Sequence, residues 1–461
     1  MKALLNRLHA KLGDFWWYSL MLFCACRAAD CLNVFVGLWL VPKYVPPSEL
    51  GAVMPLTQFA NFLVIPIGVF ASTFRNELNA LAVERKFGQM KTLMRGVFIA
   101  TAVILFLAIV LSRLLLPAYL ERIRIAEGSL GFVIIIASFI GAVNPIFTTP
   151  LQALKKLKAN AVISLIGAPI RLLAMLVTMP LRALTGYFVG QAAPPTFGTL
   201  AAVFALRKEL SVPAEPYWNR GKIKRFAKFI AIFGLSSLAG GLATLIENTV
   251  LRQRLPELDS AAYYMITRFS DIAGFLGNTL AFTIFPFTAN LAAQGKDTRP
   301  LILKSSAAVL ISNFALAIFF LVFGETILLH LPHGKEYAAY SWAIPWMITI
   351  PTMTWIVSLY TGAELSAFRF GYMKWTIPLS LAYPALMLLV SGYGYFTGFM
   401  PSSWVEFLRH HNICSLGTML CWMTGYGLIR TAFCLFFLSR TPQKFSHSSN
   451  GFAHEVPIVQ G

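Results

Sequence analysis

The stretch of sequence that decides the fold is Leu245–Asp297, which reads LIENTVLRQRLPELDSAAYYMITRFSDIAGFLGNTLAFTIFPFTANLAAQGKD. It contains two long apolar runs that are joined by a short polar turn and followed by a basic segment. Glu247 lies within the first run, and Arg268 and Asp271 lie within the second. A charge inside a membrane span costs about 3 kcal/mol or more unless it faces a partner or a water-filled cavity. We therefore expect these residues to line a cavity in a membrane-embedded bundle.

The composition of the whole chain indicates a membrane protein. Of its 461 residues, 57% are hydrophobic and 12% are charged, and the mean hydropathy is +0.67, whereas soluble domains are about 25% charged. Apolar runs of about 20 residues recur along the chain, and each can cross a hydrocarbon core of about 30 Å. The runs lack the alternating polarity of β-barrel strands. The sequence therefore predicts an all-α polytopic membrane protein.

About twelve transmembrane helices fit the hydropathy pattern. Pro194 and Pro195 make one of them, 184–206, the least regular, and a broken or re-entrant helix is an alternative there. The predicted spans are 15–41, 51–74, 94–117, 129–151, 159–181, 184–206, 226–251, 260–287, 303–329, 339–363, 373–398 and 412–438.

The basic residues set the predicted orientation. With the N-terminus in the cytoplasm, about 25 of the 38 lysines and arginines fall in cytoplasmic segments, as the positive-inside rule requires. An even number of spans then places the C-terminus in the cytoplasm as well. The net charge of +19 lies mainly in short connections between spans rather than in a soluble basic domain, so we do not expect nucleic-acid binding.

The chain divides into two halves at its longest predicted cytoplasmic connection. We expect an N-terminal lobe of six helices (residues 1–206), a cytoplasmic linker (207–225), a C-terminal lobe of six helices (226–440) and a disordered tail (441–461). Val45–Phe87 and Pro256–Thr298 share an acidic turn, an apolar span and a basic exit. We therefore hypothesise a parallel internal repeat, an arrangement in which transporters bind substrate between the halves.

Two Arg–Asp pairs lie within predicted spans. Arg27 and Asp30 are three residues apart, as are Arg268 and Asp271, so each pair shares a helical face. In one interpretation, the pairs are structural and hold neighbouring helices in register. In the other, the arginines line a central cavity and bind an anionic substrate, since a guanidinium stays charged and fits phosphate oxygens in bidentate geometry.

Further residues extend this candidate site. Arg171 adds a cation on the fifth span, and Asn248 adds a polar group beside Glu247 on the seventh. A desolvated carboxylate can titrate and carry a coupling proton, and Asp30, Glu247 and Asp271 are the candidates. Glu247 is preferred, because no basic residue lies within a helical turn of it in sequence.

Enzymatic and metal chemistry find little support in the sequence. The six cysteines lie in or beside apolar runs, where cysteine behaves as a small hydrophobic residue, and their spacing is not that of a zinc or redox motif. The chain has no phosphate-binding GxxxxGK(S/T) loop. An embedded glycan polymerase or ligase stays an alternative, although the short outer loops disfavour it. Arg430, on the last span, is close enough to the inner interface for its side chain to reach it.

Some of these segments resemble a known family. The eighth predicted span opens with Ala262-Tyr263 and exits through Phe285-Pro286 and Asn290-Leu291-Ala292, and Glu247 supplies an acidic residue on the span before it. Together with Val45–Ala82, these segments resemble the oligosaccharide-lipid (polysaccharide and O-antigen) flippases of the multidrug/oligosaccharidyl-lipid/polysaccharide (MOP) exporter superfamily.

The resemblance implies a V-shaped, MATE-like bundle of two six-helix lobes that works by alternating access. The implied substrate is a polyprenyl-diphosphate-linked oligosaccharide, which crosses a bacterial-type inner membrane during polysaccharide or lipopolysaccharide biosynthesis. Arg27 and Arg268 would contact diphosphate or acidic sugars, and Asp30, Glu247 or Asp271 would couple transport to protons or sodium.

The resemblance implies no cofactor and no enzymatic activity. The implied partners are the lipid-linked oligosaccharide, membrane lipids, a polysaccharide polymerase and glycosyltransferases. The alternative within the superfamily is a cation-coupled multidrug exporter, which would need a drug-sized pocket with fewer arginines.

Overall fold

The computed structural model describes residues 16, 29–125, 130–154, 156–293, 296–366, 371–391 and 415–440. Within these residues, every regular element is a helix. The elements are η1 (Val36–Leu40), α2 (Val41–Tyr44), α3 (Pro47–Leu50), α4 (Val53–Val83), α5 (Phe87–Arg122), α6 (Leu130–Ala153), α7 (Leu157–Thr178), α8 (Ala183–Ala205), α9 (Arg207–Leu210), α10 (Arg220–Arg254), α11 (Glu257–Ala293), α12 (Arg299–Leu329), α13 (Gly334–Tyr337), η2 (Ala338–Tyr340), α14 (Ala343–Ser366), α15 (Met373–Ser391) and α17 (Leu416–Arg440).

Helices occupy all twelve predicted span positions within the described residues, and residues 29–35 are a helical part of the first. Seven of these helices are long and apolar enough to cross a membrane by length and composition. The others include α7, of which Val162–Thr178 is a shorter apolar helix, and α10 and α11; these three carry charged residues of the candidate site. The predicted all-α polytopic membrane fold is therefore confirmed.

The predicted span 184–206 forms one continuous helix, α8. The alternative of a broken or re-entrant helix is therefore wrong, although Pro194 and Pro195 both lie inside the helix. α8 packs along α6 and α7, and helix neighbours of this kind stabilise a membrane helix that contains proline.

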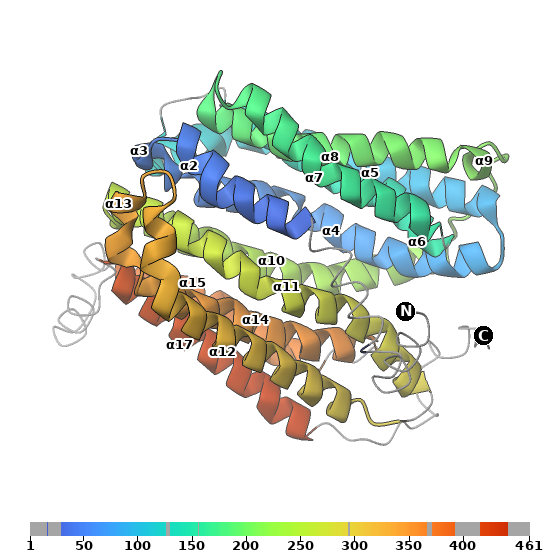
Figure 1. The fold of residues 1–461 in the computed structure, drawn as a ribbon. Coiled ribbons are helices and arrows are strands. Elements are labelled where there is room, and N and C mark those ends of the chain that lie inside the picture. Colours follow the sequence, from blue (N-terminus) through green and yellow to red (C-terminus); the bar gives the residue numbers. More distant parts are fainter. Residues whose placement is uncertain are drawn as a thin grey trace, which may run out of the picture.

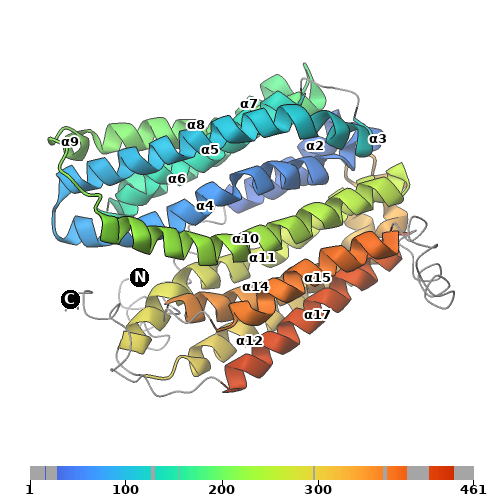
Figure 2. The same ribbon diagram turned by 180° about the vertical axis from the view of Figure 1, so that it is seen from behind.

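The helices form two packed groups (Figures 1 and 2). In the first group, α8 packs on α6 and α7, α4 packs on α6, and α5 packs against α4 and α6. In the second group, α14 packs on α11, α12 and α17, while α15 packs on α10. Because α10 also packs on α4, the groups meet along these two helices. The lobe boundaries that the sequence suggests stay a prediction.

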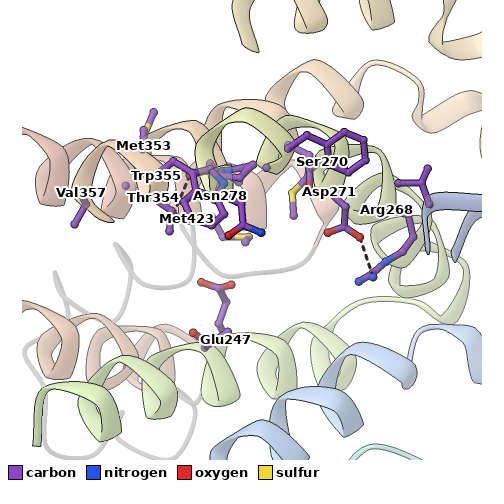
Figure 3. A pocket seen from close by; sticks show the side chains of 18 of the residues that line it. Glu247, Arg268, Ser270, Asp271, Asn278, Met353, Thr354, Trp355, Val357 and Met423 are labelled. Atoms are coloured by element: carbon purple, nitrogen blue, oxygen red, sulfur yellow. Dashed lines mark hydrogen bonds and ion pairs between the residues drawn. The ribbon is translucent and has the colours of Figure 1, made fainter. Parts of the chain in front are cut away.

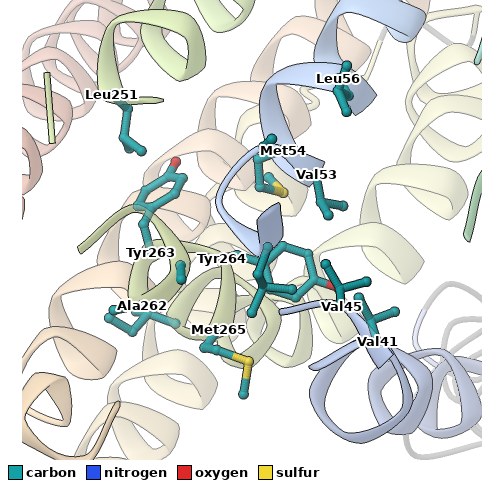
Figure 4. Close-up of a cluster of buried hydrophobic side chains, with 14 of the residues drawn as sticks. Val41, Val45, Val53, Met54, Leu56, Leu251, Ala262, Tyr263, Tyr264 and Met265 are labelled. Carbon is teal, nitrogen blue, oxygen red and sulfur yellow. The ribbon is translucent and has the colours of Figure 1, made fainter. Parts of the chain in front are cut away.

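A cluster of buried apolar side chains joins the two halves at the end of the bundle that carries α2 and α3, which we call the α2/α3 end (Figure 4). In lipid, close packing rather than the exclusion of water holds such a cluster together. Its members include Val41, Val45, Val53, Met54, Leu56, Leu251, Ala262, Tyr263, Tyr264 and Met265.

The connection between the halves lies against the first group of helices, at the opposite, α9 end of the bundle (Figure 1). The Tyr217 hydroxyl donates to Glu77 Oε2 at 2.6 Å, and the Thr92 hydroxyl donates to the Glu215 carbonyl at 2.6 Å. α10 begins at Arg220, so the last part of the predicted linker is helical. The connection is thus fixed along much of its length to the helices it leaves.

Candidate substrate cavity

A cavity of about 570 Å³ is lined by residues of both halves of the chain (Figure 3). The first half contributes the helix before η1 and α7, and the second half contributes α10, α11, α14 and α17. Six charged residues of the described ranges line the wall, and five of them were predicted from the sequence. The six are Asp30, Arg171, Glu247, Arg268, Asp271 and Arg430.

Arg268 and Asp271 form the ion pair that their spacing predicts. On α11, Arg268 Nη1 lies 2.9 Å from Asp271 Oδ2. Arg268 Nη2 donates to Met54 Sδ at 2.9 Å, and the guanidinium lies 5.0 Å from the centre of the Tyr264 ring. Arg268 Nε is buried and has no hydrogen-bond partner within the described residues. One donor of this side chain is therefore unpaired in the described part of the chain.

Arg171 brings a second guanidinium to the cavity from the other half of the chain. Its Nη1 donates to Asn33 Oδ1 at 2.8 Å. Its Nε is also buried without a hydrogen-bond partner in the described part of the chain. Asp30 lies about one helical turn before Asn33 and lines the same cavity. Two guanidinium groups from opposite halves thus each keep an unused donor beside one cavity.

Glu247 extends from α10 into the cavity, opposite Asn278 on α11 (Figure 3). The Tyr383 hydroxyl, on α15, donates to Glu247 Oε2 at 2.7 Å. The Tyr383 ring stacks on Tyr426 of α17, with centroids 4.0 Å apart and an interplanar angle of 11°. This hydrogen bond reduces the cost of burying a carboxylate. The acidic group is thus held by the second half alone in the described contacts.

Two predicted site residues are not placed on the cavity wall. Asn248 is 2% exposed, and its Nδ2 donates to the Thr244 carbonyl on its own helix at 2.9 Å. Successive helical residues differ by about 100° in direction, so Glu247 faces the cavity and Asn248 faces the packed helices. Arg27 lies outside the described residues, so the predicted pairing of Arg27 with Asp30 lies outside them as well.

Arg430 lines the cavity, whereas the sequence led us to expect it at the inner interface. Its Nε, too, has no hydrogen-bond partner among the described residues. Two signals in the sequence could have identified further lining residues. Arg430 lies four residues after the cavity residue Tyr426, and Asn278 lies seven residues after Asp271, so each shares a helical face with its predecessor.

The charged lining is balanced, with three arginines and three carboxylates among the described residues. Within the part of the chain that the structure describes, no group of three or more His, Cys, Asp or Glu side chains could hold a metal ion. The described lining therefore offers cationic donors and anionic acceptors in equal number.

Comparisons with solved structures give the class of fold. An inward-facing multidrug resistance MATE family transporter of the MOP superfamily matches with a TM-score of 0.64 and 12% identity, over 89% of this chain and 95% of that chain. The lipid II flippase MurJ, in an inward closed conformation, matches with a TM-score of 0.65 and 14% identity, over 92% and 88%. An outward-facing multidrug resistance MATE family transporter matches with a TM-score of 0.59 and 15% identity, over 94% of this chain and 97% of that chain.

No family model and no curated protein sequence matches the chain. The structural matches nevertheless cover most of the chain and of each neighbour. The chain therefore has the fold of MOP-superfamily transporters. This is the fold that the resemblance in Val45–Ala82 and around Ala262-Tyr263 implied.

Proposed function

We propose that this protein flips a polyprenyl-diphosphate-linked oligosaccharide across the cytoplasmic membrane by alternating access, for polysaccharide or O-antigen export. The observation that carries the proposal is the placement of Arg171 and Arg268. They come from opposite halves of the chain, line one cavity, and each keep a buried Nε donor without a partner in the described residues.

A diphosphate complements these two groups. Phosphate oxygens accept paired hydrogen bonds from a guanidinium, and a buried donor left unpaired costs about 1–3 kcal/mol. Asn33, Asn278 and Thr354 on the same wall offer hydrogen bonds to sugar hydroxyls, and Trp355 offers a flat apolar face. A lipid II flippase among proteins of this fold is consistent with such a substrate.

Alternating access accounts for the closed α2/α3 end. The apolar cluster joins both halves there, while the basic connections around α9 lie at the opposite end. By the positive-inside rule, the α9 end and both chain termini are cytoplasmic. The cavity of this conformation is then closed toward the outer leaflet, and loading occurs from the cytoplasmic side.

Coupling to an ion is assigned to Glu247, with Asp30 and Asp271 as further candidates. Glu247 faces the cavity and accepts a hydrogen bond from Tyr383. Binding or release of H⁺ or Na⁺ at Glu247 would therefore change the contact between α10 and α15. Glycosyltransferases would supply the lipid-linked substrate and a polysaccharide polymerase would consume it.

The proposal is tested with Arg268→Ala and Glu247→Gln in cells that lack the wild-type protein. We expect lipid-linked oligosaccharide to accumulate in the cytoplasmic leaflet while the amount of folded protein is unchanged. Arg113→Ala is the control, because this exposed α5 side chain packs over Phe132 and does not line the cavity. Normal transport by both variants would contradict the proposal, and loss of folded protein would favour a structural role.

A second candidate function is cation-coupled export of drugs. Part of the cavity wall favours it, because the lining includes Met347, Met353 and Met423 as well as Phe275 and Trp355, and methionine side chains adapt to varied apolar ligands. Efflux of a fluorescent cationic dye from intact cells distinguishes the two functions. Dye efflux that survives Arg268→Ala, with no effect on glycan export, would select the drug exporter.

A further inference from the structure

Arg268 belongs to the second half of the chain, but its side chain contacts Met54 and Gly37 of the first half. Its Nη2 donates to Met54 Sδ on α4 at 2.9 Å. Its aliphatic stem lies against Gly37, where a Cβ atom would stand 2.7 Å from Arg268 Cδ and 3.2 Å from Cγ. Any side chain at position 37 would therefore force this arginine to move.

Gly37 lies in η1, the π-helical turn that interrupts the first predicted span. Such turns are rare in proteins and occur often at functional sites. The Gly37 carbonyl accepts a hydrogen bond from the Tyr264 hydroxyl at 3.3 Å, and the Tyr264 ring faces the Arg268 guanidinium. The glycine thus provides both the space for Arg268 and an anchor for the aromatic ring beside it.

One side chain therefore contacts both the cavity and the closed end. Arg268 Nη1 pairs with Asp271 on the cavity wall, whereas Nη2 is bound to Met54, a member of the apolar cluster that joins the halves. We infer that Gly37 is a positioning residue: it holds Arg268 where its contact with Met54 keeps the two halves together at the α2/α3 end, a contact that we call the latch, and a phosphate-type anion in the cavity breaks this contact. The inference rests on the proposed function.

The hydrogen bonds of Arg268 explain why an anion would release it. Nε and Nη2 lie on the same edge of the guanidinium, the edge that a phosphate binds with two oxygens. On this edge Nε has no partner in the described residues, and Nη2 has only a thioether there, which is a weak acceptor. An anion that takes both donors displaces Met54 Sδ. The α2/α3 end then loses one of its contacts between halves.

The experiment measures the distance across the α2/α3 end in full-length protein in lipid nanodiscs. Spin labels are placed at Lys43→Cys and Leu258→Cys, two exposed positions in the two halves, after the six native cysteines are replaced by alanine. We expect inorganic pyrophosphate to increase the long-distance population at least about threefold. Gly37→Ala should show this population without pyrophosphate and respond less than twofold to it.

Matched variants separate the latch from general disruption. Gly240→Ala is the control, because a Cβ atom at this helical glycine meets nothing within 4 Å, and it should behave as wild type. Met54→Leu keeps the side-chain volume but removes the sulfur acceptor. Like Gly37→Ala, it should increase the long-distance population in the absence of pyrophosphate.

Two results would overturn the inference. Wild-type distances and a wild-type pyrophosphate response in Gly37→Ala would show that Gly37 does not position a latch. A pyrophosphate-insensitive wild type would show that an anion does not release it. Neither result depends on transport, so failure of the inference is distinguished from failure of the flippase proposal by assaying glycan export with the same proteins.

Discussion

At the scale of single residues, the Asp271 carboxylate competes electrostatically with a bound anion, because it pairs with Nη1 of Arg268 while the anion takes Nε and Nη2. The Asp271 side chain is 45% exposed, and a pair of this kind contributes about 1 kcal/mol at most. Asp271→Asn should therefore tighten pyrophosphate binding by about fivefold, as measured by calorimetry on the purified protein.

The matched control for this prediction is Glu84→Gln. Glu84 pairs with Lys86 at 2.7 Å on an exposed turn far in sequence from the cavity, so its loss should leave pyrophosphate binding unchanged. Weaker binding in Asp271→Asn would contradict the competition and assign Asp271 the role of holding Arg268 in place.

Tyr383→Phe should lower stability more than Tyr426→Phe. Both variants keep the stacked rings, but the first removes the 2.7 Å hydrogen bond to the half-buried Glu247 and the second removes only a 3.3 Å contact with Ser380. Removing one hydrogen bond to a half-buried carboxylate costs about 1 kcal/mol. Thermal unfolding in detergent measures the difference, and equal melting temperatures would show that the Tyr383 bond is not important.

Charge inside predicted spans was a reliable guide to the cavity, since lipid excludes it. The sequence could not separate Glu247 from Asn248, because adjacent positions with polar side chains leave the rotation of α10 undetermined. Gly37 carried no signal at all. Its importance comes from Arg268, which lies more than two hundred residues away in sequence and meets it only in the folded protein.

At the scale of elements, the connection before α10 can be tested through Tyr217. Burial raises the pKa of the Tyr217 hydroxyl to about 12, so it stays protonated and donates to Glu77 at neutral pH. Tyr217→Phe should lower stability by about 1 kcal/mol and speed tryptic cleavage near Arg220. Cleavage at the wild-type rate would show that this hydrogen bond does not fix the connection.

The same residue predicts a pH dependence. A free tyrosine ionises near pH 10, and the folded-state pKa of Tyr217 is higher, so the folded protein binds the proton more tightly. The contribution of Tyr217 to stability is therefore complete below about pH 10 and is lost as the pH rises toward about 12. The stability difference between wild type and Tyr217→Phe should shrink over this range in denaturant titrations.

Hydropathy identified where the helices lie, because about twenty apolar residues are needed to cross a membrane. It could not show that α8 continues through Pro194 and Pro195, since packing on α6 and α7 stabilises this helix. Nor could it give the full lengths of α10 and α11. Their polar ends extend well beyond the apolar runs that hydropathy detects.

At the scale of the whole molecule, Arg252 connects the end of α10 to the first half of the chain. It is 1% exposed, and it donates to the Ser48 carbonyl at 2.7 Å and to the Ile123 carbonyl at 3.1 Å. Losing two such bonds, at about 1 kcal/mol each, should favour opening of the α2/α3 end by about thirtyfold.

This prediction is checked by the labelling rate of a cysteine at the closed end. Ser260 is 0% exposed and contacts Gly51 of the first half, so Ser260→Cys should react with a maleimide only when that end opens. Arg252→Met should accelerate the reaction, whereas Arg254→Met, at an exposed position two residues further on, should not. Equal rates in the two variants would mean that Arg252 does not hold the end closed.

The overall architecture was accessible from the sequence because apolar periodicity survives when residue identities do not. At 12–15% identity, the MATE and MurJ structures still match about nine tenths of the chain. How the halves meet was less accessible. The cavity and the closed end depend on pairs such as Arg171 with Asn33 and Arg268 with Met54, which are distant in sequence and carry no local pattern.

The central claim is that the cavity arginines carry a lipid-linked diphosphate across the membrane. Its most direct test reconstitutes the full-length protein in liposomes that contain a fluorescent polyprenyl-diphosphate oligosaccharide, and measures how much label becomes accessible to an impermeant quencher. Wild-type protein should expose the inner-leaflet label, and Arg171→Gln or Arg268→Gln should reduce the rate at least about tenfold, with Arg113→Gln unchanged. A wild-type rate no greater than that of empty liposomes, or arginine variants as active as wild type, would contradict it.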